Sequence, residues 1–241
     1  RWLDLRRGIL FRETEWQSPS GRGVRLYSER IVSLTRPYCA AVKYTVEPLQ
    51  EGSFLRIVSM LDGNVRNLST AEDPRTGSRL GGESLRPFGG KTEDHGGVLR
   101  ARTKGSGLAL ATAVSHSWKG LEDPICRCSH ENQRILFELE GKADANCPVT
   151  VNKYITYYAG VAGEEERLEG KALKALNKAK REGFVQLCRE QKRYLDNFWQ
   201  HSDVKIEGDP QVQQSLRFNL FHLLQSVGKD GNRSISAKGL T

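Results

Sequence analysis

The sequence contains no stretch of eighteen consecutive apolar residues, and apolar residues make up 37% of its 241 positions. A helix that crosses a membrane needs about 20 such residues in a row, so the sequence predicts no transmembrane helix. A basic segment followed by an apolar one, the mark of a signal peptide, is also absent. We therefore predict a soluble, cytoplasmic protein, although a chain that starts at Arg1 instead of methionine leaves its true N-terminus and any leader undefined.

The cysteines give little support for disulfides or for a metal. They are five in number and show no repeating spacing: Cys39, Cys126, Cys128, Cys147 and Cys188. An odd, irregular set argues against a disulfide framework. Cys126 and Cys128 lie close to His130, but structural zinc sites place two to four residues between paired cysteines. We predict reduced thiols at the edge of a strand and no metal site.

The excess of positive charge, formally +8, is not gathered into a basic patch. The densest basic run covers residues 167–193, and glutamates such as Glu169, Glu182 and Glu190 interrupt it. Mixed charges on a helix are typical of a solvated face with ion pairs inside the helix. We therefore predict neither a nucleic-acid partner nor a membrane partner.

Alternation of apolar and polar residues dominates from Leu10 to Tyr158 and predicts half-buried strands. Pro19 and Gly21 provide a turn between the first two strands. The predicted strands cover residues 12–16, 24–34, 42–46, 54–61, 98–103, 108–118, 135–140 and 149–158. This number of strands, separated by turn signals, indicates a large antiparallel sandwich.

Residues 69–97 interrupt the alternation. They are rich in glycine, arginine and aspartate, and their large apolar residues are Leu80, Leu85 and Phe88. We predict a long excursion between strands. Such a loop either contributes to an interface or a site, or is an ordinary surface loop, and the sequence does not decide between the two.

Helical periodicity replaces the alternation after Gly160. Glutamates at 164–166 open a first amphipathic helix, Gly183 closes it, and a second helix follows to Trp199. Asp209 as N-cap and Pro210 at the first position then specify a third helix that runs to Ser226. The predicted domains are a sandwich at 1–162, a helical linker at 163–201 and the start of a helical domain at 202–241.

The third helix carries apolar residues on nearly every face: Val212, Leu216, Phe218, Leu220, Phe221, Leu223 and Leu224. This pattern is typical of a helix surrounded by other helices. Too few residues follow it to bury those side chains. We expect the chain to be the front part of a larger protein.

Several residue types able to carry chemistry are present but are not arranged for it. Glu13 with Glu15 and Glu138 with Glu140 are paired carboxylates, and we predict that they face solvent from strands. Histidines are scattered over different elements: His116, His130, His201 and His222. No nucleophile turn accompanies them, so a hydrolytic triad has no support. Four aromatics offer sugar stacking but are expected to be core: Trp16, Tyr27, Tyr157 and Tyr158.

Three stretches resemble glycoside hydrolase family 65, which includes phosphorylases of maltose, trehalose, kojibiose and nigerose and related hydrolases. The first pairs residues 3–10 (LDLRRGIL) with Glu15-Trp16, the second is 202–210 (SDVKIEGDP), and the third joins 216–223 (LRFNLFHL) to 235–241 (ISAKGLT). The resemblance covers essentially the whole chain, and its last two stretches are the specific ones. It implies an N-terminal β-super-sandwich that lacks its opening strands, a helical linker, and the first helix of a truncated (α/α)6 barrel.

The family resemblance also implies a reaction. A barrel glutamate protonates the glycosidic oxygen while inorganic phosphate, a co-substrate, attacks the anomeric carbon from the opposite face, which gives inversion and β-glucose 1-phosphate. That glutamate is expected beyond Thr241, so no catalytic residue and no cofactor is predicted in this chain. Lys238, Gly239 and Thr241 are expected near the substrate pocket, residues 69–97 are a candidate loop leaning toward it, and a homodimer is expected.

Three hypotheses follow. The first is the N-terminal part of an inverting disaccharide phosphorylase, inactive by itself. The second is a hydrolase of the same family, of the acid-trehalase type, in which a carboxylate base activates water in place of phosphate. The third is a free-standing carbohydrate-binding or structural sandwich, which an exposed strip of aromatic residues on one sheet would favour.

Overall fold

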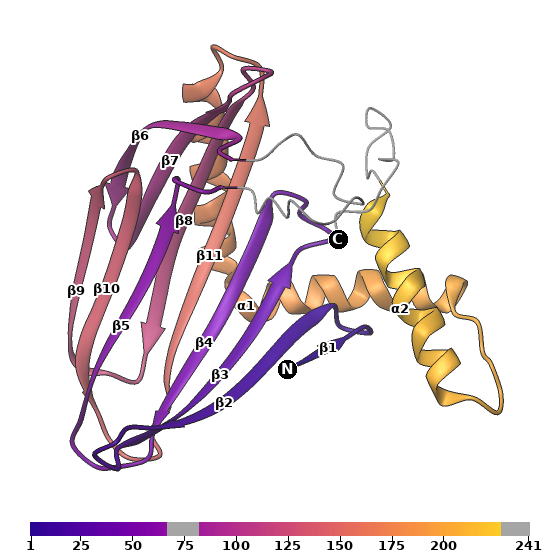
Figure 1. Ribbon diagram of the computed structural model, residues 1–241, viewed down its shortest axis with the longest axis horizontal. Coiled ribbons are helices and arrows are strands. Elements are labelled where there is room, and N and C mark those ends of the chain that lie inside the picture. The colour runs from indigo at the N-terminus through magenta and orange to yellow at the C-terminus, as the bar shows by residue number, and fades with distance from the viewer. Residues whose placement is uncertain (67–81, 228–241) are drawn as a thin grey trace.

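The computed structural model describes residues 1–66 and 82–227. Two antiparallel sheets and two helices make up this part of the chain (Figure 1). The strands are β1 (Trp2–Asp4), β2 (Ile9–Gln17), β3 (Gly23–Val32), β4 (Cys39–Pro48), β5 (Ser53–Asp62), β6 (Leu85–Glu93), β7 (Gly96–Thr103), β8 (Ala109–Lys119), β9 (Glu122–Glu131), β10 (Arg134–Ala143) and β11 (Val149–Gly160). The helices are α1 (Glu165–Ser202) and α2 (Pro210–Ser226).

The molecule has three layers, and the larger sheet is the middle one. Its eight strands run in the order β1-β2-β3-β4-β11-β8-β7-β6, while the smaller sheet has the order β5-β10-β9. Helix α1 packs on one face of the large sheet, mainly against β8 and β11. The small sheet covers part of the other face (Figure 1). The predicted mainly antiparallel sandwich is therefore confirmed.

Apolar side chains pack in two interiors, one between α1 and the large sheet and one between the two sheets, and the alternation along each strand decides which side chain enters which interior. On β10, Ile135, Phe137 and Leu139 are fully buried, and the residues between them lie on the outer face of the small sheet. On β8, alanines at 109, 111 and 113 face α1, whereas Val114 faces the small sheet. Successive side chains of a strand point to opposite faces, so one strand of the middle layer serves both interiors.

The prediction of one long excursion over residues 69–97 is wrong for its second half. Residues Leu85–Glu93 form β6, which pairs with β7 across a register shift between Pro87 and Gly89. Apolar alternation is missing there because β6 is the edge of the large sheet and two of its glycines pack closely on Arg100 and Leu99. Residues 67–81 lie outside the described part.

Helix α1 contains both predicted helices of the linker. Gly183, with φ 84° and ψ 166°, leaves helical geometry inside it, so the predicted boundary is confirmed. A positive φ of this kind is adopted far more readily by glycine than by other residues. The helix buries one face along its whole length, through Leu168, Ala172, Leu176, Ala179, Phe184, Leu187, Gln191 and Leu195.

The expected ion pairs inside α1 are only part of the observed set. Lys178 and Glu182 form one at 4.0 Å, and Lys192 and Asp196 form another at 2.6 Å. Other α1 glutamates contact cations of the strands and their connections instead, as in the Arg36–Glu190 pair at 2.6 Å and the Lys91–Glu169 pair at 2.7 Å. The glutamates face the sheet because the helix lies flat on it, which sequence spacing within one helix does not reveal.

A single buried amide joins the second half of α1 to the strands. Gln191 is 1% exposed, and its Oε1 accepts from the backbone N–H of Leu34 at 2.8 Å. Its Nε2 donates to the carbonyls of Gly8 at 3.3 Å and Val32 at 3.2 Å. Gly8 has φ 62°, and a Cβ there would lie 2.7 Å from Nε2. The loop after β1 and the end of β3 are therefore fixed by one side chain.

Replacement of Gln191 by leucine is expected to lower the free energy of unfolding by about 3 kcal/mol. The change keeps the side-chain volume but leaves an N–H and two carbonyls without their partner in a buried site. Urea unfolding followed by tryptophan fluorescence measures the difference. Lys192→Leu, at the adjacent exposed position, is the control and is expected to change stability by less than about 1 kcal/mol. Equal effects of the two substitutions would contradict the role assigned to the amide.

Candidate functional site

The residues predicted to contact substrate, Lys238, Gly239 and Thr241, lie outside the described part of the chain. The same holds for the stretch 235–241 of the family resemblance. Their role stays a prediction. The described surfaces that remain as candidates are the paired carboxylates, the cysteine and histidine cluster, the groove between the sheets and the surface of α2.

Three of the four paired carboxylates form ion pairs with arginines near the surface of the described part of the chain. Arg56 bridges Glu138 and Glu140 on the outer face of the small sheet, with 3.1 Å from its Nε to Glu140. Glu13 and Glu15 are exposed on β2, and Glu15 lies 3.7 Å from Arg25. Neither pair lines any of the cavities described below.

The Cys126–His130 segment lies on β9, the edge strand of the small sheet, which agrees with the predicted strand edge. The Sγ of Cys126 is 3.7 Å from Nδ1 of His95, and the Sγ of Cys128 donates to the carbonyl of Gly96 at 2.9 Å. Burial raises the pKa of both thiols. Within residues 1–66 and 82–227, no cluster of three or more histidine, cysteine or acidic side chains is placed to hold a metal ion.

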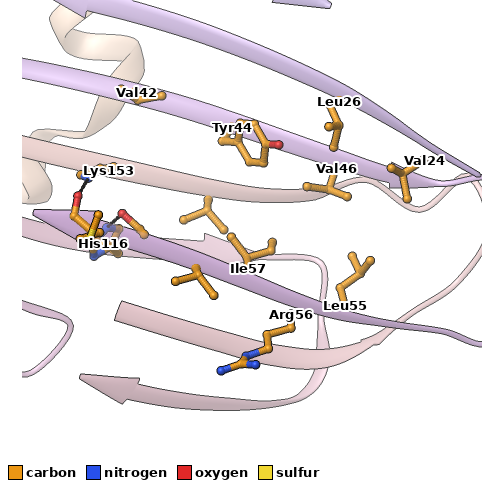
Figure 2. Close-up of a pocket in the computed structure, with 14 residues that line it drawn as sticks. Val24, Leu26, Val42, Tyr44, Val46, Leu55, Arg56, Ile57, His116 and Lys153 are labelled. Carbon is orange, nitrogen blue, oxygen red and sulfur yellow. Dashed lines mark hydrogen bonds between the residues drawn. The ribbon is translucent and has the colours of Figure 1, made fainter. Parts of the chain in front are cut away.

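An open groove of about 520 Å³ lies between the two sheets (Figure 2). One wall is formed by β3, β4 and β11 of the large sheet, and the other by β5 of the small sheet. Its lining is mostly apolar and comprises Val24, Leu26, Val42, Tyr44, Val46, Leu55, Arg56, Ile57, Val58, Ser59, Met60, His116, Val151 and Lys153. The groove exists because the small sheet packs over β6, β7, β8 and β11 and covers the inner faces of β3 and β4 only in part.

Three polar side chains meet at one end of this groove. His116 is 1% exposed, and its Nδ1 donates to the carbonyl of His95 at 2.8 Å. Its Nε2 therefore accepts from the hydroxyl of Ser59, also at 2.8 Å. Lys153 donates from Nζ to the carbonyl of Met60 at 2.8 Å. The network ties β8 and β11 of the large sheet to β5 of the small one.

Burial sets the protonation state of these groups. Burial lowers the pKa of His116 to about 4, so its ring is neutral at pH 7. Burial also lowers the pKa of the Lys153 ammonium. Both nitrogens of His116 are occupied and its ring stacks on Phe137 at 4.0 Å. The histidine is a structural connection between the sheets, and the groove is suited to apolar side chains.

The aromatic residues expected in the core divide into two kinds. Tyr27 makes tilted ring contacts with Phe11 and Trp2, and Tyr158 stacks on Tyr38 at 4.6 Å. The expectation is wrong for Trp16 and Tyr157, which are 54% and 41% exposed. These two lie on β2 and β11, with β3 and β4 between them in the sheet, so they do not form a continuous strip.

Helix α2 begins as predicted. The side chain of Asp209 accepts from the N–H groups of Gln211 and Val212, and Pro210 occupies the first turn. Arg217 binds both carboxylate oxygens of Asp203, at 2.8 and 2.7 Å, and fixes the helix against the end of α1. The side chain of Gln213 further bonds the backbone of Val204 and Ile206.

The apolar faces of α2 are largely uncovered in this chain. Phe221 is its buried residue, while Val212, Phe218 and Leu223 are 48%, 46% and 62% exposed. A hollow of about 650 Å³ separates the helix from β1 and is lined by Arg1, Trp2, Leu3, Leu5, Gln214, Ser215, Phe218 and Asn219. Helix α2 thus presents an apolar contact surface at one end of the molecule (Figure 1).

Sequence reasoning did not find the His116–Ser59 contact or the groove. The two residues are 57 positions apart and belong to different sheets. No periodicity connects them. The apolar residues on both faces of β5 were the available signal, since a strand with such a sequence needs cover on both sides. In the described ranges, neither helix is long and apolar enough to cross a membrane.

Comparison with known proteins gives a consistent result. Residues 1–198 match the model of the glycosyl hydrolase family 65 N-terminal domain. An α,α-trehalose phosphorylase of Thermoanaerobacter brockii is 38% identical over 241 residues, which is 100% of this chain and 31% of the relative. An α,α-trehalose phosphorylase of Geobacillus stearothermophilus is 31% identical over 253 residues, again with 100% of this chain and 31% of the relative.

A solved structure named "Putative kojibiose phosphorylase from human microbiome" has the same fold, with a TM-score of 0.83 and 22% sequence identity. The similarity covers 99% of this chain and 30% of that one. The chain therefore spans about a third of the length of the relatives that it matches.

The stability of the chain is expected to fall as the pH drops from 6.5 to 4. Because the pKa of His116 is about 4 in the folded state and near 6.5 when unfolded, the unfolded state binds the proton more tightly in this window. The loss reaches about 3 kcal/mol when the pH approaches 4. Urea unfolding at pH 7 and pH 4.5 measures it. His116→Gln keeps a donor and an acceptor without titrating, and is expected to show a shallower dependence. An unchanged dependence in this variant would rule out His116 as the cause.

Trypsin is expected to cleave after Lys205, between the two helices, and Asp203→Ala is expected to speed this cleavage about two- to fivefold. The substitution removes the bidentate contact with Arg217 that holds α2 in place. Limited proteolysis with mass spectrometry of the fragments gives the site and the rate. Asp196→Ala, which removes an exposed pair inside α1, is the matched control and should leave the rate unchanged. Equal acceleration in both variants would show that the Asp203–Arg217 contact does not hold the helix.

Proposed function

The chain belongs to glycosyl hydrolase family 65, and we propose that it forms the N-terminal part of an inverting phosphorylase that cleaves α-linked glucose disaccharides with inorganic phosphate. The observation that carries this proposal is the alignment of the whole chain with α,α-trehalose phosphorylases at 38% and 31% identity. Trehalose is the proposed substrate, because a kojibiose phosphorylase from Caldanaerobacter subterraneus is less similar, at 26% identity.

The proposed reaction transfers glucose from a disaccharide to phosphate. A phosphate oxygen forms a bond to the anomeric carbon while the bond from that carbon to the glycosidic oxygen breaks. A carboxylic acid donates its proton to the leaving oxygen, and attack from the opposite face inverts the configuration. Trehalose and phosphate then yield β-glucose 1-phosphate and glucose. We place the acid, a glutamate, in the catalytic domain beyond Thr241.

The described residues support a scaffolding role for this chain. Glu138 and Glu140 form ion pairs with Arg56, and both ring nitrogens of His116 are hydrogen-bonded within the protein. The uncovered apolar side chains of α2, together with the hollow beside β1, fit contact with a catalytic helical barrel of which α2 is the first helix. Lys238, Gly239 and Thr241 are proposed at the rim of its substrate pocket, and the full enzyme is proposed to be a cytoplasmic homodimer.

The second candidate is a hydrolase of the same family. It differs in one group, since a carboxylate base activates water where the phosphorylase binds phosphate. A requirement for phosphate therefore separates the two. The third candidate is a free-standing carbohydrate-binding or structural sandwich. It is not favoured because the exposed Trp16 and Tyr157 lie on strands separated by β3 and β4, and because α2 leaves apolar side chains uncovered.

The full-length enzyme is expected to release glucose 1-phosphate from trehalose only when inorganic phosphate is present. Proton NMR of the product is expected to show the large anomeric coupling of the β form, as inversion requires. Residues 1–241 alone, the control, are expected to release nothing. Release of free glucose alone without phosphate would establish the hydrolase instead, and an α-phosphate product would contradict inversion.

A further inference from the structure

We propose that the outer face of the first half of α1 binds a small phosphorylated ligand of the nucleoside di- or triphosphate class. Four cations of α1 and the ring of Tyr158, near the end of β11, form the site. The site is separate from the surfaces assigned to the activity proposed above, so it does not depend on that activity.

The four cations lie in one line along α1, and we call them the cation row: Lys171, Lys174, Lys178 and Arg181. They are spaced three, four and three residues apart, and side chains with these spacings are neighbours on one face of a helix. All four are exposed, whereas Ala172, Leu176 and Ala179 form the buried face of the same turns. Because each residue adds about 1.5 Å along the helix axis, the row is about 15 Å long.

The carboxylates of the first half of α1 leave the cation row largely unneutralised. Lys178 reaches Glu182 only at 4.0 Å, and Glu166 is five residues from Lys171, a spacing that does not bring two side chains together on a helix. Charges that alternate in the sequence are therefore separated in the folded chain, with the cations on the outer face. Four carboxylates are paired with cations outside the row: Glu164 with Arg167, Glu165 with Arg102, Glu169 with Lys91, and Glu182 with Arg36.

An open hollow of about 630 Å³ borders the cation row. The ring of Tyr158 faces this hollow, and it stacks on Tyr38 with ring centroids 4.6 Å apart, which fixes its position. Hollows of about 300–1,000 Å³ hold small-molecule ligands. The full lining brings the four cations and one aromatic ring around a single space, and it comprises Tyr158, Lys171, Lys174, Ala175, Asn177, Lys178 and Arg181.

These side chains match the two parts of a nucleoside polyphosphate. Lysine and arginine donate charge-assisted hydrogen bonds to phosphate oxygens, and a row of them suits a chain of phosphates. A base stacks on an aromatic side chain, for which Tyr158 is placed at the same hollow. A single phosphate group would occupy only part of a row about 15 Å long. The ligand class that uses both the row and the ring is therefore a nucleoside with two or three phosphates.

Acidic residues beyond both ends of the cation row favour a small ligand over a polynucleotide. Glutamates at 164–166 precede the row, and Glu182 and Glu190 follow it along α1. A polynucleotide gains affinity from many phosphate contacts along an extended cationic surface. Its backbone would have to pass these carboxylates, whereas a nucleotide fits in the interval between them.

Isothermal titration calorimetry of the full-length protein with ATP, in magnesium-free buffer at low ionic strength, tests the site. The double substitution Lys171→Gln with Lys174→Gln is expected to weaken ATP binding at least about tenfold, because two charge-assisted contacts to phosphate are lost. The control is Lys142→Gln with Lys192→Gln, which removes the same charge from exposed positions outside the row and is expected to change the affinity less than about twofold. Absence of ATP binding, or equal binding by the wild type and the row variant, would overturn the proposal.

A second comparison tests the stacking of the base. Tyr158→Leu is expected to weaken ATP binding at least about fivefold and to leave the binding of tripolyphosphate, which has no ring, within about twofold. Tyr158→Phe keeps the aromatic ring and is the control, with affinity for ATP close to that of the wild type. An equal loss for ATP and tripolyphosphate in Tyr158→Leu would overturn the assignment to a nucleoside phosphate.

Photolabelling of the unmodified full-length protein locates the nucleotide without any substitution. Labelling by 8-azidoadenosine triphosphate, read by mass spectrometry of the peptides, is expected at Tyr158 or within residues 171–181. Labelling only elsewhere in the protein would overturn the proposal. Binding of a short RNA oligonucleotide that is tighter than that of ATP, and that is lost in the row variant, would assign the row to a polynucleotide and would also overturn it.

Discussion

The close approach of α1 to the eight-stranded sheet is the constraint on which the rest of the structure depends. Three alanines of β8, at 109, 111 and 113, are fully buried beneath the helix and leave room for Ala172 and Ala179. The hydroxyl of Thr156 donates to the carbonyl of Ala172 at 2.8 Å, a contact that only a short helix-to-sheet distance permits. Because α1 seals this face, the opposite face of the same strands is left to form the sandwich.

Ion pairs at the periphery of this contact also hold α1 against the sheet. Arg36 on the β3–β4 connection reaches Glu182 and Glu190, on either side of the bend at Gly183. Lys91 and Arg100 meet Glu169 from β6 and β7, and Arg102 meets Glu165. Glutamates of the linker helix are thereby distributed over strands that are far apart in sequence. Each partly exposed pair contributes little, but together they fix the direction in which the helix crosses the sheet.

The sequence predicts elements better than it predicts their relations. Alternation located most strands, and the Asp209–Pro210 cap located α2, because both signals are local. The strand in the second half of the 69–97 stretch was not predicted, because β6 is an edge strand rich in glycine and charge, with little apolar alternation. The partners of Gln191 could not be predicted because they lie more than 150 residues away in the sequence. An isolated glutamine in an amphipathic helix also shows no distinguishing pattern. Of the candidate site residues, those at 238–241 remain predictions, and the groove became visible only when the two sheets were placed together.

The break at Gly183 has a consequence for how the linker tolerates change in length. An added residue rotates everything that follows in a continuous helix by about 100°, which would turn Gln191 away from Gly8 and Val32. Here the chain leaves helical geometry between the two halves, with the backbone of Gly183 at φ 84°. An insertion before Gly183 therefore rotates only the alanine-rich first half of α1. The non-helical backbone at Gly183 accommodates this rotation, so the second half keeps its orientation. Gly183 separates two stretches of helix. The first can change in length while Gln191, in the second, keeps its hydrogen bonds to Gly8 and Val32.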